Sequence, residues 1–138
     1  MLYLLAPFAY IGTIFGDNES IIKIPLLLAD LAILFFLVKI FPHKKQKLIL
    51  FYFLNPIIIY SIYIHSQLDI IPTALLFGSV YFLLIDKIKI SSIFFGLALS
   101  TKFHVIIALP LVLFYLYKKQ KSIKVVEYIA ISFFILLL

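Results

Sequence analysis

The chain alternates long apolar runs with short polar breaks. Runs that approach about 20 residues indicate helices that cross a bilayer. The apolar runs cover residues 1–15, 21–41, 48–64, 70–85 and 90–117, and a last run begins after Lys124 and continues to Leu138. This pattern predicts an all-α integral membrane fold, a polytopic helical bundle in which several transmembrane helices are short or broken.

The run of residues 90–117 is too long for one straight span. As a single helix it would measure about 42 Å, whereas the hydrocarbon core of a bilayer is about 30 Å thick. A break at Ser100-Thr101-Lys102 would give two short helices, the second of which returns towards the start of the first. This hairpin also places the three basic stretches on one side of the membrane, as the positive-inside rule favours. These stretches are residues 42–47, 86–89 and 118–124.

Composition supports the membrane class and excludes others. Of the 138 residues, 65% are hydrophobic and 13% are charged, whereas a soluble domain is nearer half apolar and a quarter charged. The chain has no cysteine, which excludes disulfides, thiolate metal sites and a cysteine nucleophile. Most of the lysines lie in short loops. The net charge of +6 therefore indicates membrane topology and predicts no nucleic-acid partner.

Two polar positions lie inside apolar runs. Asn55-Pro56 predicts a kink in the run of residues 48–64, because proline removes a backbone hydrogen bond; Asn55 is placed to cap the carbonyls set free. Asp30 lies nine residues into its run, about 14 Å deep by helical rise. A buried carboxylate must be paired, solvated or protonated. It is either functional or a packing residue bonded to a neighbouring Ser or Tyr hydroxyl, and both interpretations stay open.

A polar corner, His65-Ser66-Gln67-Leu68-Asp69, separates two apolar runs. His65 and Asp69 would share a face if the helix continued through the corner, and either could act as a general base. The alternative is a solvated turn in which Asp69 caps the helix that follows. One His and one Asp do not make a metal site, because such a site needs three or four ligands.

Lys102 lies at the predicted break, between two apolar stretches. A lysine at such a point could meet a phosphate group as a point charge. The alternative is a lysine that snorkels to the membrane interface. The hairpin places Lys102 on the external side, where lysine is less usual, and this favours a function.

The order of these motifs resembles the GT-C superfamily of polytopic glycosyltransferases, which includes the dolichyl-phosphate-mannose-dependent mannosyltransferases. The matching pieces are Leu4 to Tyr10, Lys23-Ile24-Pro25 with Asp30, Asn55-Pro56, His65 to Asp69, and Gly96 to Lys102 followed by Pro110. The resemblance covers most of the chain. Each motif is weak alone, and their order and spacing carry the likeness.

The resemblance implies transfer of a hexose, expected to be mannose, from a polyprenyl-phosphate donor to a lipid-linked or protein acceptor on the external face. By resemblance, His65, Gln67 and Asp69 bind substrate in the external cavity and Lys102 holds the donor phosphate. Asp30 and Asn55 support the scaffold. No cofactor is implied with certainty, and a divalent cation stays open.

The resemblance also implies that residues 1–138 form part of a larger transmembrane domain. The catalytic base of the family precedes the segment matched here, so no residue of this chain is assigned to that role, and the fragment alone is expected to be inactive. The apolar run at Leu138 suggests a truncated C-terminus. The expected location is the plasma membrane of a prokaryote or the endoplasmic reticulum of a eukaryote, in several passes.

Two other classes of protein stay open. Intramembrane Asp30 and Lys102 could belong to an ion or proton path in a transporter or channel segment. Alternatively, the polar side chains could only join helices in a structural membrane subunit.

Overall fold

The computed structural model describes residues 2–16, 18–119 and 122–137. Every element within these ranges is helical, which confirms the all-α prediction. The chain divides into two compact units, Met1–Ala74 and Leu75–Leu138, and the boundary falls within one helix. The sequence gives no sign of this boundary, because residues 70–85 form one unbroken apolar run.

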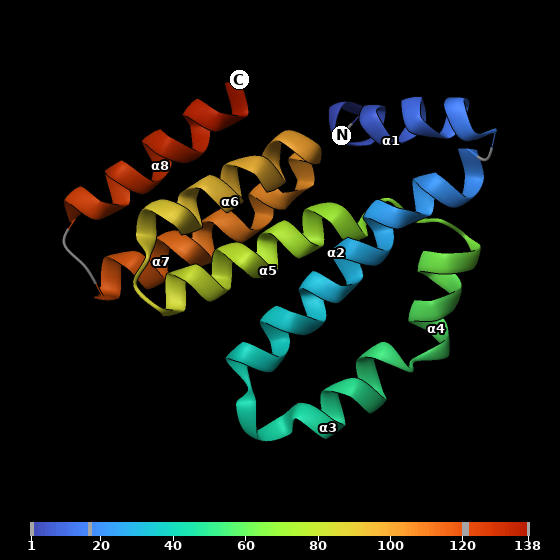
Figure 1. The fold of residues 1–138 in the computed structure, drawn as a ribbon. Helices are drawn as coiled ribbons and strands as arrows, with labels where there is room; N and C mark the ends of the chain where they lie inside the picture. Colours follow the sequence, from blue (N-terminus) through green and yellow to red (C-terminus); the bar gives the residue numbers. More distant parts are fainter. Residues whose placement is uncertain (1, 17, 120–121, 138) are drawn as a thin grey trace. The chain divides into compact units, whose positions relative to one another are not determined.

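The first unit begins with two helices that pack against each other (Figure 1). α1 covers Leu2–Phe15 and α2 covers Asn18–Ile40. Gly16, which ends α1, has a φ of +71°, a left-handed conformation that glycine adopts without steric cost. α2 starts three residues before the predicted run of residues 21–41. Asp17 and the side chain of Glu19 lie outside the described residues.

One face of α2 is buried within the first unit. Leu26, Ala29, Ile33 and Phe36 are each at most 9% exposed, and their spacing of three or four residues places them on one helical stripe. Asp30 adjoins this stripe and is 1% exposed. The carboxylate therefore lies on the packed face of the helix, not on its outer face.

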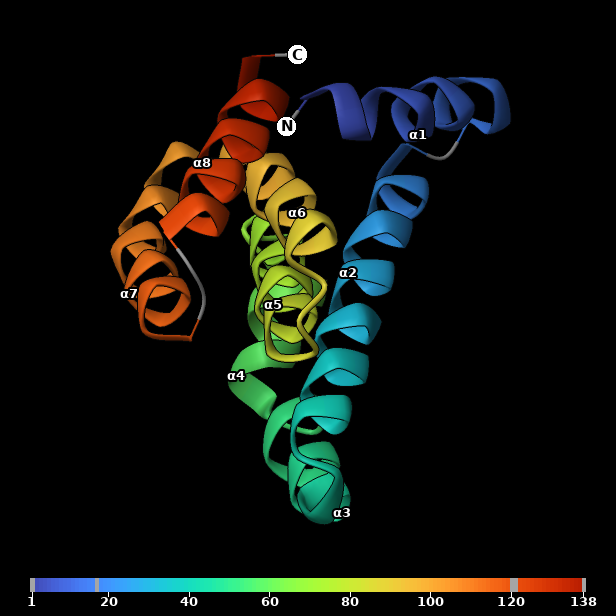
Figure 2. The same cartoon turned by 90° about the vertical axis from the view of Figure 1, so that its left-hand side faces the viewer.

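After α2 the chain turns back in short helical pieces (Figure 2). The pieces are η1 (Pro42–Lys44), α3 (Lys45–Leu48), η2 (Ile49–Phe53), α4 (Pro56–Ile59) and η3 (Tyr60–Ile64), of which η1 is a 3-10 turn and η2 and η3 are π-helical. The kink predicted at Asn55-Pro56 is present. The prediction of one helix over residues 48–64 is otherwise wrong, because each side of the kink widens to π geometry. Residues 42–47, predicted as a loop, are helical, since Pro42 starts a turn.

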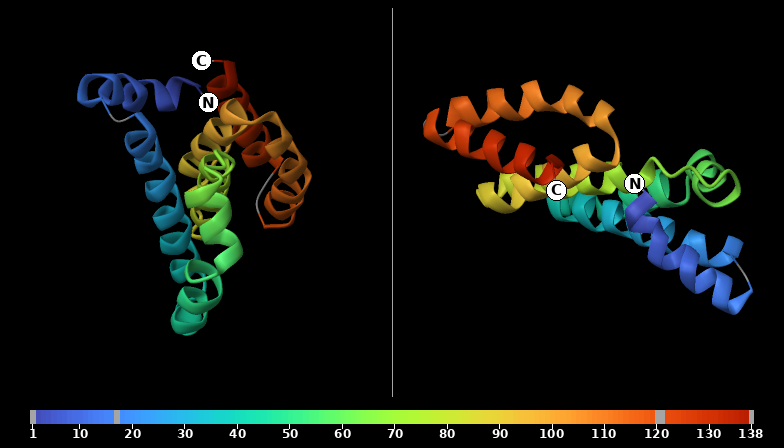
Figure 3. Two further views of the ribbon diagram at one scale, coloured as in Figure 1. Left: turned by 90° about the vertical axis from the view of Figure 1, so that its right-hand side faces the viewer. Right: turned by 90° about the horizontal axis from the view of Figure 1, so that it is seen from above.

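The second unit contains most of α5 (Ile70–Leu84), followed by α6 (Ile88–Thr101), the 3-10 segment η4 (Phe103–Ala108), α7 (Leu109–Lys119) and α8 (Ser122–Leu137). The break predicted at Ser100-Thr101-Lys102 is confirmed: α6 ends at Thr101 and Lys102 is extended. Figures 1 and 3 show the chain reversing direction there. Helix α8 packs closely on α6.

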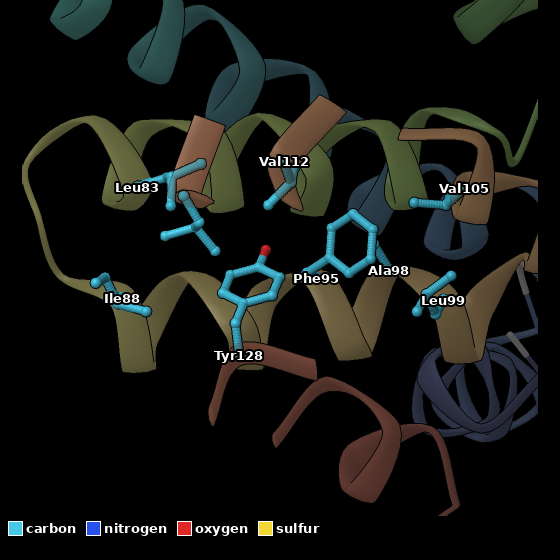
Figure 4. Packing of buried hydrophobic residues seen from close by; sticks show 9 residues of the cluster. Leu83, Ile88, Phe95, Ala98, Leu99, Val105, Val112 and Tyr128 are labelled. Carbon is cyan, nitrogen blue, oxygen red and sulfur yellow. The ribbon is translucent and has the colours of Figure 1, made fainter. Parts of the chain in front are cut away.

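The core of the second unit lies between these helices (Figure 4). Its members, all at most 6% exposed, are Leu83, Ile88, Phe95, Ala98, Leu99, Val105, Val112, Leu116 and Tyr128. Phe95 and Tyr128 bring their ring centroids to 5.8 Å. Because Val105 and Val112 follow the break and Phe95 precedes it, the hairpin is held by apolar packing on both sides of Lys102.

Small and hydroxylated residues let α6 and α8 approach closely. A Cβ atom on Gly96 would lie 2.7 Å from the carbonyl oxygen of Ser132 and 2.9 Å from Cβ of Ile135. The Ser132 hydroxyl donates to the carbonyl of Ser92 at 3.1 Å. Such close contact between backbones through small residues is typical of helix pairs in membranes.

A cluster of buried hydroxyl groups joins α5, α6 and α8. Ser79 Oγ lies 3.1 Å from Ser91 Oγ and 3.0 Å from the Tyr128 hydroxyl. Ser91 also donates to the carbonyl of Ser79 at 2.8 Å. All three side chains are fully buried, and their mutual hydrogen bonds offset the cost of removing them from water.

No helix within the described ranges is both long enough and apolar enough to cross a membrane alone. Two consecutive stretches, Lys23–Ile40 and Pro42–Tyr52, meet the requirement together, and they are bent by 113° at their junction. Shorter apolar helices cover Leu5–Ile14, Ile70–Leu84 and Ile88–Thr101.

Candidate functional site

A buried carboxylate with two tyrosine donors is the most constrained polar site of the first unit. The Tyr52 hydroxyl donates to Oδ1 of Asp30 at 2.8 Å, and the Tyr63 hydroxyl donates to Oδ2 at 2.7 Å. Hydrogen bonds to a carboxylate are shorter and stronger than those between neutral groups. Each carboxylate oxygen thus has its own donor. Asp30 has the hydroxyl partners that the packing interpretation expected.

The two tyrosines reach one carboxylate because the helix that carries them is broken. Tyr52 lies in η2 and Tyr63 in η3, eleven residues apart and on opposite sides of the kink. Pro56 follows Asn55, whose backbone is extended with φ −71° and ψ 119°. Single π-helical turns are rare and occur often at functional sites. Here two of them carry the tyrosines that hold Asp30.

Asn55 satisfies backbone groups on both sides of the kink. Its Oδ1 accepts from the Ile57 amide at 2.9 Å, and its Nδ2 donates to the carbonyl of Phe51 at 3.3 Å. The predicted capping of a freed carbonyl is therefore confirmed. The same side chain also starts α4, so Asn55 ends one helical piece and begins the next.

The corner from His65 to Asp69 is a turn. The His65 ring stacks on Tyr60 with a centroid distance of 6.4 Å and an interplanar angle of 9°, and Ser66 has a φ of 52°. Because the backbone leaves helical geometry, His65 and Asp69 do not share a helix face. His65, Gln67 and Asp69 are all exposed, as the solvated-turn alternative expected.

Asp69 stands at the start of α5. Its carbonyl accepts from the Thr73 amide at 3.3 Å and from the Thr73 hydroxyl at 2.7 Å. The backbone of Asp69 thus makes the first helical bond, while its exposed carboxylate stands at the helix N-terminus, where a negative charge is favourable.

Lys102 lies at the helix break of the second unit, and its side chain contributes an ammonium group there. Its backbone has φ −150° and ψ 118°, between the end of α6 and the start of η4. Its amide donates to the carbonyl of Ala98 at 3.1 Å, and its carbonyl accepts from the Val105 amide at 3.2 Å. His104, two residues on, is exposed. The convergence of Lys102 with Gln67 and Asp69 stays a prediction, since they belong to different units.

The tyrosine partners of Asp30 and the hydroxyl cluster of the second unit were not predicted as site residues. The need of Asp30 for donors predicts hydroxyl partners such as Ser or Tyr, but it does not select Tyr52 and Tyr63. Ser79, Ser91 and Tyr128 give no comparable signal, because they lie far apart in the sequence. Among the described residues, no three His, Asp or Glu side chains lie together in a way that could hold a metal ion.

Comparison of the chain with protein-family models, with curated proteins and with solved structures found no match.

Proposed function

We propose that this chain is a multi-pass integral membrane protein and part of a glycosyltransferase. In this proposal the parent enzyme transfers a hexose, mannose by family likeness, from a polyprenyl-phosphate donor to a lipid-linked or protein acceptor. The membrane is the plasma membrane of a prokaryote or the endoplasmic reticulum of a eukaryote. The observation that carries the proposal is a lysine at a break in an otherwise apolar helical hairpin.

The outward faces of the second unit support the membrane setting. On η4 and α7, Ile107, Leu111, Phe114 and Tyr117 are 67–77% exposed and follow each other at intervals of three or four residues. They form a continuous apolar stripe, a feature that marks an interaction surface when it occurs on a soluble protein. Lipid acyl chains are the simplest environment for such a stripe on a chain that is 65% hydrophobic.

The breaks in the helices support a ligand site at membrane depth. Broken helices that meet at a polar point are a common way to build such sites in membrane proteins. The second unit has such a break at the extended backbone of Lys102, whose ammonium group suits a phosphate. Short helical pieces also leave room for the prenyl chain of a lipid donor to enter from the bilayer.

The chemistry assigned to Lys102 is electrostatic. The acceptor hydroxyl oxygen bonds to the anomeric carbon of the sugar as the bond from that carbon to the phosphate oxygen breaks. The leaving phosphate gains negative charge, and a fixed cation stabilises that charge in the transition state. His65, Gln67 and Asp69 are assigned to the hydroxyl groups of sugar and acceptor. The base that takes the acceptor proton is not assigned.

Binding of a radiolabelled mannosyl polyprenyl phosphate to the purified protein in vesicles tests the proposal. Lys102→Ala should weaken binding about tenfold to a hundredfold, because a hydrogen bond to a charged group is worth about 1.5–3 kcal/mol. Lys102→Arg, which keeps the charge, should retain most of it. Lys45→Ala, which removes an exposed lysine from α3, is the control. Equal binding by Lys102→Ala and the wild type would remove Lys102 from the site.

Ion flux through the same vesicles separates the proposal from transport. A protein that conducts ions and binds no sugar donor would belong to the transporter class. Donor binding without flux would favour the transferase.

A further inference from the structure

Basic side chains gather where four helices of the second unit begin or end. Lys87 belongs to the turn between α5 and α6, Lys89 lies in the first turn of α6, and Lys118 and Lys119 end α7. Lys124 lies in the first turns of α8. We call these five lysines the basic end of the second unit. The α5–α6 turn lies beside the end of α7, as Figure 1 shows.

Two ion pairs join the elements of the basic end. Lys119 Nζ lies 2.8 Å from Oδ1 of Asp86, which links α7 to the α5–α6 turn. Lys89 Nζ lies 3.5 Å from Oε1 of Glu127, which links α6 to α8. These contacts are partly or largely exposed, so they contribute little to stability. They do show which helix ends lie next to each other.

The charge of the basic end is positive after the acids are counted. Five lysines against Asp86 and Glu127 leave three net positive charges among the described residues. The hydrogen bond with Asp86, and after it the one with Tyr115, raise the pKa of Lys119. Lys119 therefore stays protonated at neutral pH.

The apolar stripe of η4 and α7 runs up to the basic end. Its last member, Tyr117, is 71% exposed and directly precedes Lys118 and Lys119. Along this surface, apolar side chains are followed by an aromatic ring and then by lysines. This order matches the regions of a bilayer, from the acyl chains through the interface to the headgroups. A second stripe on α8, from Ile123 through Val126 and Phe134 to Leu137, is 65–84% exposed and starts at the same end.

We propose that the basic end binds the phosphate groups of anionic phospholipids, while the stripes of α7 and α8 lie among their acyl chains. The proposal rests on the membrane setting proposed above and adds the class of lipid and the part of the chain that meets it. Basic residues beside a membrane helix attract anionic lipid. A nucleic acid would complement the positive charge of the basic end, but it would leave the adjoining apolar stripes without a partner.

Association of spin-labelled phosphatidylglycerol with the full chain tests this inference. The protein is placed in vesicles of phosphatidylcholine and in vesicles of equal parts phosphatidylcholine and phosphatidylglycerol. The wild type should prefer spin-labelled phosphatidylglycerol over spin-labelled phosphatidylcholine, and added salt should reduce this preference. Lys87→Gln with Lys118→Gln removes two exposed lysines that belong to neither ion pair. This change should weaken the preference about tenfold, or about 1.4 kcal/mol.

The matched control is Lys44→Gln with Lys45→Gln, which removes two exposed lysines from the first unit. It should leave most of the preference in place. Equal association of both labelled lipids with the wild type, or equal losses in the two double variants, would overturn the inference. Resistance of the protein to carbonate extraction from both kinds of vesicle is measured first. Extraction from both would refute the membrane setting itself, whereas stable insertion without lipid preference would refute only the lipid class.

Discussion

The Asp30 site provides the sharpest test of the first unit. Tyr52→Phe and Tyr63→Phe each remove one hydroxyl and little else, because phenylalanine keeps the ring. The lost bonds are those of 2.8 Å and 2.7 Å to the two carboxylate oxygens. Their partner is 1% exposed, so water cannot readily replace the missing donors.

The size of the effect follows from the charge and burial of the partners. A hydrogen bond to a charged group is worth about 1.5–3 kcal/mol. Because both tyrosines are only partly buried, we expect a value at the lower end of this range. We expect each single variant to lose about 1.5 kcal/mol of unfolding free energy. The double variant should lose about 4 kcal/mol, more than the sum, because it leaves a buried carboxylate with neither donor.

A third change shows whether the carboxylate is the cause. In the double variant, Asp30→Leu removes the group that lost its donors and should recover about 1–2 kcal/mol, because replacing a buried ionic group by an apolar one is often favourable. In the wild type the same change should destabilise, since it takes the acceptor from both hydroxyls. This reversal of sign is not expected if Asp30 contributes only its volume.

Unfolding in mixed micelles, followed by near-ultraviolet circular dichroism, gives the free energies, and hydrogen exchange of the amides in residues 49–64 reports the local effect. Tyr60→Phe is the control. It lies between the two tyrosines, is 57% exposed and has the same chemistry, and should change stability by less than about 0.5 kcal/mol. Changes in Tyr52→Phe and Tyr63→Phe no larger than that of Tyr60→Phe would refute the reasoning.

Two further substitutions test the elements around the sites. Asn55→Ala removes the acceptor of the Ile57 amide and should lower the free energy of unfolding by about 0.5–2 kcal/mol, as loss of an N-cap does. Faster hydrogen exchange in residues 56–59 is the local readout. Exchange equal to that of the wild type would contradict the capping role. Gly96→Ala places a methyl group 2.7 Å from the Ser132 carbonyl oxygen and should destabilise the second unit by about 1–3 kcal/mol through overpacking. Ser100→Ala, on the exposed part of the same helix, is its control, and equal stability of the two variants in thermal unfolding would show that α6 and α8 do not pack as described.

The sequence contained the main breaks of the fold but not their geometry. Residues 90–117 exceed the length of one span, and the polar residues Ser100-Thr101-Lys102 located the break within them. Proline after Asn55 located the kink, because a proline inside a helix removes a backbone bond. The apolar pattern of residues 48–64 did not indicate the π-helical turns at η2 and η3.

The candidate site was predictable only as single residues. A carboxylate in an apolar run needs hydrogen-bond donors, and this need can be read from the sequence. The donors to Asp30 are Tyr52 and Tyr63, which lie 22 and 33 residues away. No local rule selects them among the nine tyrosines of the chain. The same holds for Ser79, Ser91 and Tyr128. Helical periodicity predicts a buried face but not which hydroxyls on different helices will meet.

The reach of the two tyrosines has a consequence for synthesis. On the ribosome Asp30 emerges 22 residues before its first donor and 33 before its second. At 5–20 residues per second, this delay is roughly 1–7 s. During that time the carboxylate must stay hydrated or take up a proton. Residues 18–40 can therefore settle in their final surroundings only after Tyr63 has been made.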